Sequence, residues 1–374
     1  MNLMAQLMEV LDSLTKPAQL FEPLENGSVR CLACAHGCRI KPGGRGFCQV
    51  RFNRDGTLMA PWGYVAGVQV DPIEKKPFNH FLPGTSALTF GMLGCDFHCD
   101  FCQNWLSSQV LRDDQATRSV GSIQQVQPEK LVDFAVKSGA RIVASSYNEP
   151  LITTEWAVDV FKQAKKSGLK CVFISNGNAT PQALEYLKPY LDGYKIDLKS
   201  MQDKNYHELG GKLQNVLDTI KKAHELGFWV EIVTLVIPDY NDSNEELWEA
   251  ARFIASVSPD IPWHVTAFHP DYRMNDRPPT SVDTLVRAAE IGQESGLHYV
   301  YAGNLPGRVK SLEDTFCPNC NTRLIARMGY MLHDYRITGQ GTCPKCGAKQ
   351  PGVWMDDPGK INYGEDRFPR RVVF

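Results

Sequence analysis

Hydrophobic and polar residues follow two different periods along the middle of the chain. Between about residues 85 and 304, short β-branched apolar runs are each followed by a longer segment with apolar residues at helical spacing. This alternation is typical of successive βα units with parallel strands. It predicts strands at residues 86–91, 141–147, 170–175, 193–198, 228–236, 264–268 and 297–302, and helices at 128–137, 155–167, 181–190, 213–226, 243–256 and 281–294.

The number and order of these units predict an α/β fold. Seven parallel strands within residues 85–304 suit a partial or full (β/α) barrel, and a doubly wound open sheet is the alternative. We prefer the barrel. The flanks differ from it: residues 1–84 form a cysteine-rich region that we expect to bind metal, and residues 305–374 carry two further CxxC pairs and a basic, proline-rich tail. The chain is therefore divided into three regions.

The first residues resemble a packing helix more than a targeting signal. Leu3, Leu7 and Leu11 recur at helical spacing within residues 1–14, and acidic residues interrupt the segment. No apolar run approaches the ~20 residues of a membrane span. The net charge of -2, from 40 Lys and Arg against 42 Asp and Glu, gives no general attraction for nucleic acid or anionic membranes.

The 12 cysteines give the strongest indication of function. Short CxxC spacings in a chain without a signal peptide are more often metal sites in a reducing compartment than disulfides, so we expect a cytoplasmic protein. Cys171 stands alone in a predicted strand and is interpreted as a buried core thiol. The others form three groups: Cys31, Cys34, Cys38 and Cys48; Cys95, Cys99 and Cys102; and Cys317, Cys320, Cys343 and Cys346.

The middle group follows directly after the first predicted strand, in a Cx3Cx2C loop. Three thiolates suit an iron–sulfur cluster that leaves one iron open to an exchangeable ligand. A tetrahedral zinc site needs a fourth ligand from elsewhere. The candidates for that alternative are His36, His80 and His98.

The later strand ends add polar residues at the edge where barrels place their functional groups. Glu149 follows the second strand, where its carboxylate suits either a ligand ammonium group or a helix start. Ser175 and Asn176 end the third strand, where an ordinary polar turn is the alternative. After the sixth strand, His264 or His269 could reach a ligand, and we choose His269.

The fourth strand carries Lys195, Asp197 and Lys199 on one face, because side chains alternate along a strand. Three charges on a central strand are costly to bury unless they meet each other or a polar ligand. A zwitterionic ligand would satisfy them, and an internal ion-pair network is the alternative.

The last four cysteines form two CxxC knuckles separated by 22 residues, which predicts a tetrahedral zinc ribbon; a rubredoxin-like iron site is the minor alternative. The first four cysteines have a less standard spacing. They suit either zinc or an auxiliary iron–sulfur cluster, and we lean to zinc.

The Cx3Cx2C loop, with Phe101 before its last cysteine, resembles the signature of the radical S-adenosylmethionine (SAM) enzymes. The resemblance implies that Cys95, Cys99 and Cys102 bind a catalytic 4Fe-4S cluster, whose open iron takes the amino and carboxylate groups of SAM. One electron from the reduced cluster would split the sulfonium bond. The resulting 5′-deoxyadenosyl radical would abstract hydrogen from a substrate.

The strand ends fit the same resemblance. They match three motifs of that family. The first is the acid of a Gly-Gly-Glu-Pro type motif, in which Tyr147 and Asn148 stand in place of the glycines. The others are a Thr-Asn-Gly turn near the ribose and the Asp-x-Lys motif of the pyruvate formate-lyase activating enzyme type. The implied SAM-binding residues are Asn148, Glu149, Ser175, Asn176, Asp197 and Lys199, together with His269.

Nearly the whole chain is similar to the radical enzymes of the AmmeMemoRadiSam system. The matching segments are residues 31–48, 73–81, 94–104 and 147–150 and the final ribbon. That resemblance implies AMMECR-type and Memo-type companion proteins and a low-potential electron donor, but it supplies no settled substrate. Three hypotheses therefore stand: an enzyme acting on a metabolite or peptide, an activase acting on a glycine of a partner protein, and a non-catalytic scaffold stabilised by metals.

Overall fold

The largest sheet has nine strands among the residues that the computed structural model describes, which are 3–119, 121, 123–361, 363 and 369–373. Their order is β16-β15-β14-β13-β12-β11-β9-β8-β20. Seven of them run parallel: β9 (Ser86–Gly91), β11 (Ile142–Ser145), β12 (Lys170–Ser175), β13 (Gly193–Asp197), β14 (Trp229–Val236), β15 (Trp263–Ala267) and β16 (Val300–Gly303).

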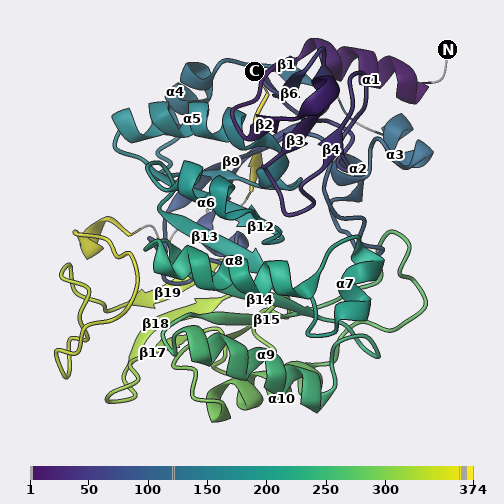
Figure 1. Cartoon of the computed structure of the whole chain (residues 1–374). Helices are drawn as coiled ribbons and strands as arrows, with labels where there is room; N and C mark the ends of the chain where they lie inside the picture. The colour runs from purple at the N-terminus through teal and green to yellow at the C-terminus, as the bar shows by residue number, and fades with distance from the viewer. Residues whose placement is uncertain (1–2, 120, 122, 362, 364–368, 374) are drawn as a thin grey trace.

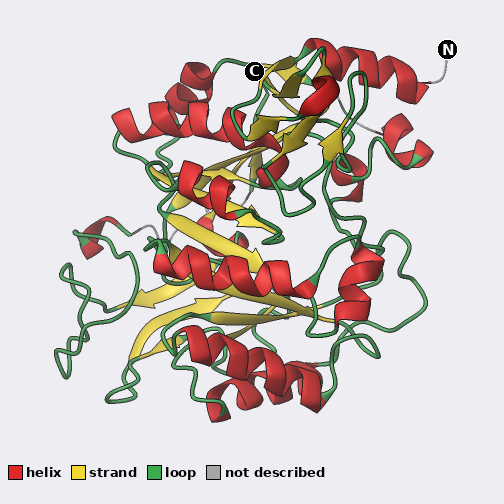
Figure 2. Cartoon of the chain, in the orientation of Figure 1, coloured by secondary structure: helices red, strands yellow, loops and turns green. Residues whose placement is uncertain are grey.

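The parallel strands neighbour one another in sequence order. Because crossovers between parallel strands are almost always right-handed, a sheet that grows in one direction receives its helices on one face. Figure 2 shows helices from the connections between the parallel strands packed against the sheet. They are α4 (Pro128–Lys137), α5 (Thr154–Lys166), α6 (Pro181–Leu187), α8 (Leu213–Glu225), α9 (Asn244–Val257) and α10 (Val282–Glu294).

The predicted α/β class is confirmed, and each predicted strand and helix of the central region has a counterpart within a few residues. The strand order lacks the reversal that defines a doubly wound sheet. Helix α7 (Asp203–Leu209) was not among the predicted elements. Closure of the sheet toward a barrel stays a prediction, as does the division into three regions.

Local signals explain where the helices begin. Pro128 and Pro181 occupy the first turns of α4 and α6, where a missing N–H does no harm. The side chains of Thr180, Ser243 and Ser281 each accept a hydrogen bond from the backbone N–H three residues ahead. The helix positions are therefore encoded close to where they occur.

The face of the sheet opposite the helices is covered by residues 73–81, here called the inner segment. It begins with the short helix η2 (Ile73–Lys75), and Phe78 and Phe81 pack against β9, β11 and β12. Gly193 makes room for it, because a Cβ atom there would lie 3.0 Å from the Phe81 ring. The parallel sheet is thus buried on both faces, as such sheets usually are.

A buried carboxylate on β14 anchors the inner segment. Glu231 is fully buried and accepts hydrogen bonds from the backbone N–H groups of Asn79 and His80, both at 2.9 Å. It also contacts Trp229 Nε1 at 2.9 Å and His264 Nε2 at 2.6 Å. Burial raises the pKa of this carboxyl, but these partners outweigh burial and hold it below its usual value.

The N-terminal region forms small sheets, and Figure 1 shows those of residues 15–61 in purple to dark blue together with α1 (Leu3–Ser13). Met1 and Asn2, at the start of the predicted first helix, lie outside the described residues. The strands are β1 (Thr15–Pro17), β6 (Thr57–Pro61) and β5 (Phe52–Arg54), then β2 (Phe21–Pro23), β3 (Val29–Cys31) and β4 (Arg39–Ile40), and finally β7 (Tyr64–Val65) paired with β10 (Gln124–Gln125).

Both flanks of the chain join the main sheet. β8 (Gly67–Pro72) adds antiparallel to β9, and β20 (Arg370–Arg371) pairs with β8. The C-terminal strands β17 (Thr315–Phe316), β18 (Arg323–Met328) and β19 (Met331–Tyr335) form a separate sheet. This C-terminal lobe attaches to the inner segment, because Val353 N–H donates to the His80 carbonyl at 2.7 Å and Leu82 N–H to the Val353 carbonyl at 2.7 Å.

In the described part of the chain, no helix combines the length and apolar character needed to cross a membrane.

The role of Glu231 predicts a large loss of stability when its carboxylate is removed. Glu231→Ala leaves several buried donors without an acceptor, so we expect the free energy of unfolding to fall by about 3–5 kcal/mol. Denaturant titration under anaerobic conditions measures this change. Glu249→Ala, on the exposed surface of α9, is the matched control, and an equal effect of both changes would contradict the anchoring role.

Candidate functional site

The Cx3Cx2C loop leaves the carboxyl end of β9 and turns back over the sheet. Gly94 has φ +90°, and a Cβ atom there would lie 3.0 Å from a Val50 methyl group and 3.3 Å from the Cys48 carbonyl. Only glycine fits this close approach without strain. Phe97 N–H donates to Cys95 Sγ at 3.3 Å, and Cys102 Sγ lies 3.2 Å from Ser108 Oγ.

A cavity of about 380 Å³, here called the chamber, lies at the carboxyl ends of the parallel strands. The loop forms one of its walls. The chamber brings together the loop cysteines and six of the seven residues predicted to bind SAM: Cys95, Cys99, Cys102, Asn148, Glu149, Ser175, Asn176, Asp197 and Lys199.

The two histidine candidates lie outside the chamber. His269 is exposed and accepts a hydrogen bond at 3.0 Å from Gln103 Nε2, whose side chain does line the chamber. His264 is buried against Glu231 instead.

Asp96 ties the cysteine loop to the end of β12. Its buried carboxylate accepts hydrogen bonds from Asn176 Nδ2 at 2.8 Å and Asn178 Nδ2 at 2.9 Å. His36, from the N-terminal region, contacts the Asp96 carbonyl at 2.9 Å. Sequence reasoning missed Asp96, although an acidic residue directly after the first cysteine of the loop was a visible signal.

Glu149 is held by neighbouring donors before any ligand arrives. It accepts hydrogen bonds from Ser175 Oγ at 2.7 Å, the Asn176 N–H at 2.8 Å and the Leu151 N–H at 3.0 Å. It therefore caps the short helix η3 (Pro150–Thr153) while its side chain also lines the chamber. Burial and the nearby Asp96 carboxylate raise the pKa of Glu149 to about 8.

The charged residues of β13 and of the segment directly after it lie on the face that strand alternation predicts. Tyr194, Ile196 and Leu198 join the core on the helix side, whereas Lys195, Asp197 and Lys199 line the chamber. Asp197 pairs with both lysines, with Lys199 Nζ at 3.1 Å.

The contact of two ammonium groups with one carboxylate shifts the pKa values of Asp197 and Lys199. Burial raises the pKa of Asp197, but the two lysines outweigh burial and lower it to about 2. The pKa of Lys199 is raised, because Asp197 and Cys99 outweigh the lowering effect of burial. Burial lowers the pKa of Lys195, although Asp197 opposes this effect. With both lysines protonated, the ion-pair network carries one positive charge in excess.

The three cysteine groups differ in how closely their sulfur atoms approach. In the C-terminal lobe, the ligand atoms of Cys317, Cys320, Cys343 and Cys346 all lie within 4.8 Å of one another. Two of the distances are 3.6 Å (Cys317 to Cys346) and 3.7 Å (Cys320 to Cys343). A tetrahedral zinc ion with Zn–S bonds of about 2.3 Å requires about 3.8 Å, so this donor set fits a single metal ion.

The other two groups do not reach single-ion spacing. Within the described residues, the C-terminal set is the one group of three or more His, Cys, Asp or Glu side chains that meets the 4.8 Å limit. Neither the Cx3Cx2C cysteines with His36, His80 or His98, nor Cys31, Cys34, Cys38 and Cys48, form such a group. Burial raises the pKa of Cys95, Cys99 and Cys102, so metal binding would have to release their protons.

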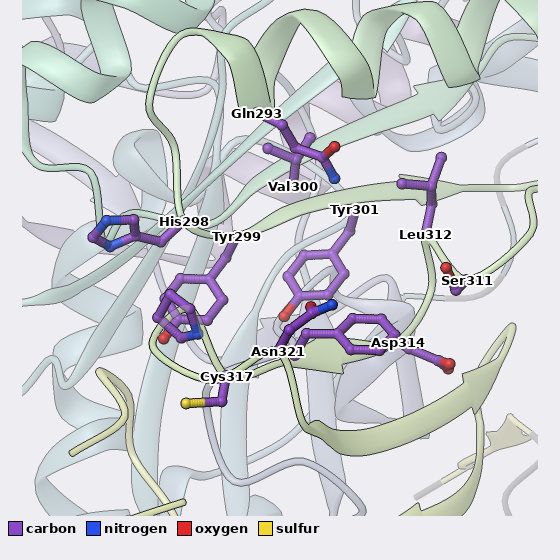
Figure 3. A pocket seen from close by; sticks show the side chains of 12 residues that line it. Gln293, His298, Tyr299, Val300, Tyr301, Ser311, Leu312, Asp314, Cys317 and Asn321 are labelled. Carbon is purple, nitrogen blue, oxygen red and sulfur yellow. The ribbon is translucent and has the colours of Figure 1, made fainter. Parts of the chain in front are cut away.

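A second, larger cavity of about 580 Å³ lies between α10, β16 and the C-terminal lobe. Figure 3 shows Tyr299 and Tyr301 extending from the strand toward Cys317 and Asn321. Of the residues predicted to carry chemistry, it contains Cys317 alone. The chamber, although smaller, is therefore the candidate functional site.

The similarity to known proteins identifies the family. Residues 90–254 match the model of the Radical SAM superfamily. Over 314 residues, the chain is 38% identical to an uncharacterized protein of Methanocaldococcus jannaschii, covering 83% of this chain and 91% of that protein. The chain belongs to the radical SAM superfamily. The resemblance inferred from the cysteine loop is thereby confirmed, and membership of the AmmeMemoRadiSam system stays a prediction.

Two further proteins are less similar to this radical SAM protein. The pyruvate formate-lyase-activating enzyme of Clostridium pasteurianum is 26% identical over 179 residues, which is 47% of this chain and 71% of that enzyme. The crystal structure of Streptococcus suis SuiB superimposes with a TM-score of 0.44 at 17% identity, covering 62% of this chain and 52% of that chain.

The contacts of Asp96 predict weaker retention of a metal cluster when they are lost. Asp96→Ala removes the acceptor of two asparagine side chains beside the loop. We expect iron bound at the Cx3Cx2C loop to be held about 10–100-fold more weakly, as for other groups that orient metal ligands. Competition with an iron chelator measures this. Asp100→Ala, an exposed position of the same loop, should behave like the parent protein, and equal iron loss in both would contradict the proposed tether.

Proposed function

We propose that this protein is a radical SAM enzyme whose chamber binds SAM beside a 4Fe-4S cluster held by Cys95, Cys99 and Cys102. One observation carries the proposal: the three cysteines share a single cavity with the acidic, amide and lysine side chains predicted to hold SAM. When bound, such a cluster supplies the electron that splits SAM into methionine and a 5′-deoxyadenosyl radical. That radical abstracts hydrogen from the substrate.

The chain's own residues then have distinct tasks. Glu149, oriented by Ser175 and Asn176, accepts a hydrogen bond from the SAM ammonium group. The excess positive charge of Lys195, Asp197 and Lys199 attracts the SAM carboxylate. Asn148 lies between the loop and this pocket, since its Oδ1 accepts a hydrogen bond from Met92 N–H at 2.9 Å. His269 lies outside the chamber and contacts Gln103, which lines it.

The remaining cysteines are proposed as two further metal centres. The sulfur spacing in the C-terminal lobe supports a zinc ribbon at Cys317, Cys320, Cys343 and Cys346. The wider spacing of Cys31, Cys34, Cys38 and Cys48 favours an auxiliary iron–sulfur cluster over the single zinc ion that we expected from the sequence. We also interpret the consecutive parallel sheet as a partial barrel.

An activase function is the second candidate, because two of the relatives carry the names of activating enzymes for pyruvate formate-lyase and isethionate sulfite-lyase. The proposed AMMECR-type and Memo-type companions and a low-potential electron donor are partners of either function. An activase would leave a glycyl radical on its partner protein, whereas an enzyme acting on a metabolite or peptide would not.

Reductive cleavage of SAM tests the proposed function directly. The anaerobically reconstituted and reduced protein is expected to form 5′-deoxyadenosine and methionine, measured by liquid chromatography. Cys99→Ala removes a cluster ligand and should abolish SAM cleavage. Cys320→Ala should loosen the C-terminal lobe but retain most of the SAM cleavage activity. Absence of cleavage by the parent protein, with its iron in place, would refute the catalytic proposal.

Metal content tests the assignment of the three centres. Protein purified without oxygen should contain about eight irons and about one zinc if the N-terminal cysteines hold an auxiliary cluster. About four irons with about two zincs would instead assign zinc to that group. A protein without iron would overturn the proposed function.

A further inference from the structure

The chamber contains a second charged group that the proposed SAM site does not use. It consists of Asp71, Lys75, Lys76 and Tyr147, here called the Asp71 group. Asp71 is fully buried and pairs with Lys75 Nζ at 2.8 Å and Lys76 Nζ at 2.7 Å. Tyr147 Oη donates a hydrogen bond at 2.8 Å to Asp71 Oδ2, the carboxylate oxygen that Lys76 also contacts. Lys75, Lys76 and Tyr147 all line the chamber.

With both lysines protonated, the Asp71 group has a net charge of +1. Two ammonium groups share one carboxylate, and the side chain of Lys76 is only 5% exposed. Burial lowers the pKa of Lys76 to about 8 despite Asp71, and the charges of Lys75 and Lys195 add to this lowering. A buried, incompletely neutralised cation is stabilised by any anion that enters beside it.

The backbone is specially arranged to hold Tyr147 in this place. Tyr147 has φ +69°, a left-handed conformation that is unfavourable for a bulky residue. Gly91 permits it, because a Cβ atom there would lie 2.5 Å from the Ser146 carbonyl and 2.9 Å from Tyr147 Cβ. Such a conformation persists because the surrounding contacts hold it in place. Here it aims the hydroxyl at Asp71 and fixes the acceptor between the two lysines.

The Asp71 group has its own carboxylate, distinct from the one that Lys195 and Lys199 share. Lys75 and Lys76 pair with Asp71, whereas Lys195 and Lys199 pair with Asp197. The two groups are neighbours, because the charge of Lys195 contributes to lowering the pKa of Lys76. Lys75 also lines a smaller cavity of about 80 Å³ that shares Pro77, Thr266, Asn304 and Tyr330 with the chamber. Within the Asp71 group, Lys75 thus lies between the chamber and this smaller cavity.

We propose that Lys75 and Lys76 bind an anionic group, a carboxylate or phosphate, of the substrate that meets the 5′-deoxyadenosyl radical. This inference rests on the proposed function and adds to it the chemical class of the substrate. SAM has one carboxylate, and the lysines of β13 beside the cysteine loop provide for it. The second excess charge therefore serves another molecule.

Binding of simple anions to the SAM-loaded, unreduced protein tests the proposal. The probes are glutarate for a carboxylate, glycerol 2-phosphate for a phosphate, and glutaramide as the neutral match of glutarate, each titrated by calorimetry under anaerobic conditions. Lys76→Gln leaves Asp71 and Lys75 as a neutral pair. We expect it to weaken the preferred anion at least about tenfold and to leave glutaramide unchanged.

Controls separate loss of the site from loss of the fold. Lys162→Gln removes a lysine of α5 that pairs with Asp159 outside the chamber, and it should bind the anions as the parent does. Should Lys76→Gln fail to fold, Lys75→Gln, whose side chain is 25% exposed, takes its place with the same expectation. In addition, the preferred anion should slow acetylation of Lys76 by acetic anhydride, measured by peptide mass spectrometry.

Each outcome decides the matter. Tighter binding of glutarate or of glycerol 2-phosphate identifies which anion the site prefers. Equal affinity of the parent for glutarate, glycerol 2-phosphate and glutaramide, or unchanged anion binding in Lys76→Gln, would overturn the inference. SAM cleavage by the reduced parent protein is scored separately, so a protein that cleaves SAM but ignores the anions disproves only the substrate class.

Discussion

Two carboxylates buried side by side, Asp96 and Glu149, constrain the rest of the candidate site. One asparagine joins them: Asn176 donates its side-chain amide to Asp96 and its backbone N–H to Glu149. Each carboxylate must find donors within the protein because neither can reach water freely. Apart from the Leu151 N–H, these donors come from β12 and the turn after it, so the cysteine loop has a defined position before any cofactor binds.

The same constraint connects the N-terminal region to the chemistry. His36 contacts the Asp96 carbonyl, and the Ala35 N–H donates to the Asn178 carbonyl at 2.8 Å. The cysteines near His36 are therefore anchored on the residues that position the Cx3Cx2C loop. On the opposite face of the site, Glu231 anchors the inner segment, which in turn brings Lys75 and Lys76 to the chamber. Buried acceptors thus organise both walls.

The sequence predicted what short-range patterns encode. Strand and helix periods located the central units, and the rule that parallel strands end at a common edge correctly gathered Glu149, Asn176 and Asp197 with the cysteines. The sequence did not predict the long-range packing, because residues 73–81 carry no periodic signal for covering the inner face of the sheet. It also did not predict α7, because seven residues are too few for a helical period to show. His269, predicted to bind SAM, is exposed beyond the end of β15 and does not line the chamber, and its side chain contacts Gln103. Cysteine spacing likewise could not give the distances between sulfur atoms, which decide between one ion and a cluster.

The compact sulfur set of the C-terminal lobe has a consequence for handling in air. Its sulfur pairs, 3.6 Å and 3.7 Å apart, need only small movements to reach the disulfide length of about 2.05 Å, and Cys346 is exposed to solvent. Oxidation and metal therefore compete for the same four atoms. A lobe closed by two disulfides would be as compact as one closed by a metal ion, so a well-folded, air-exposed sample of this protein can be a metal-free one.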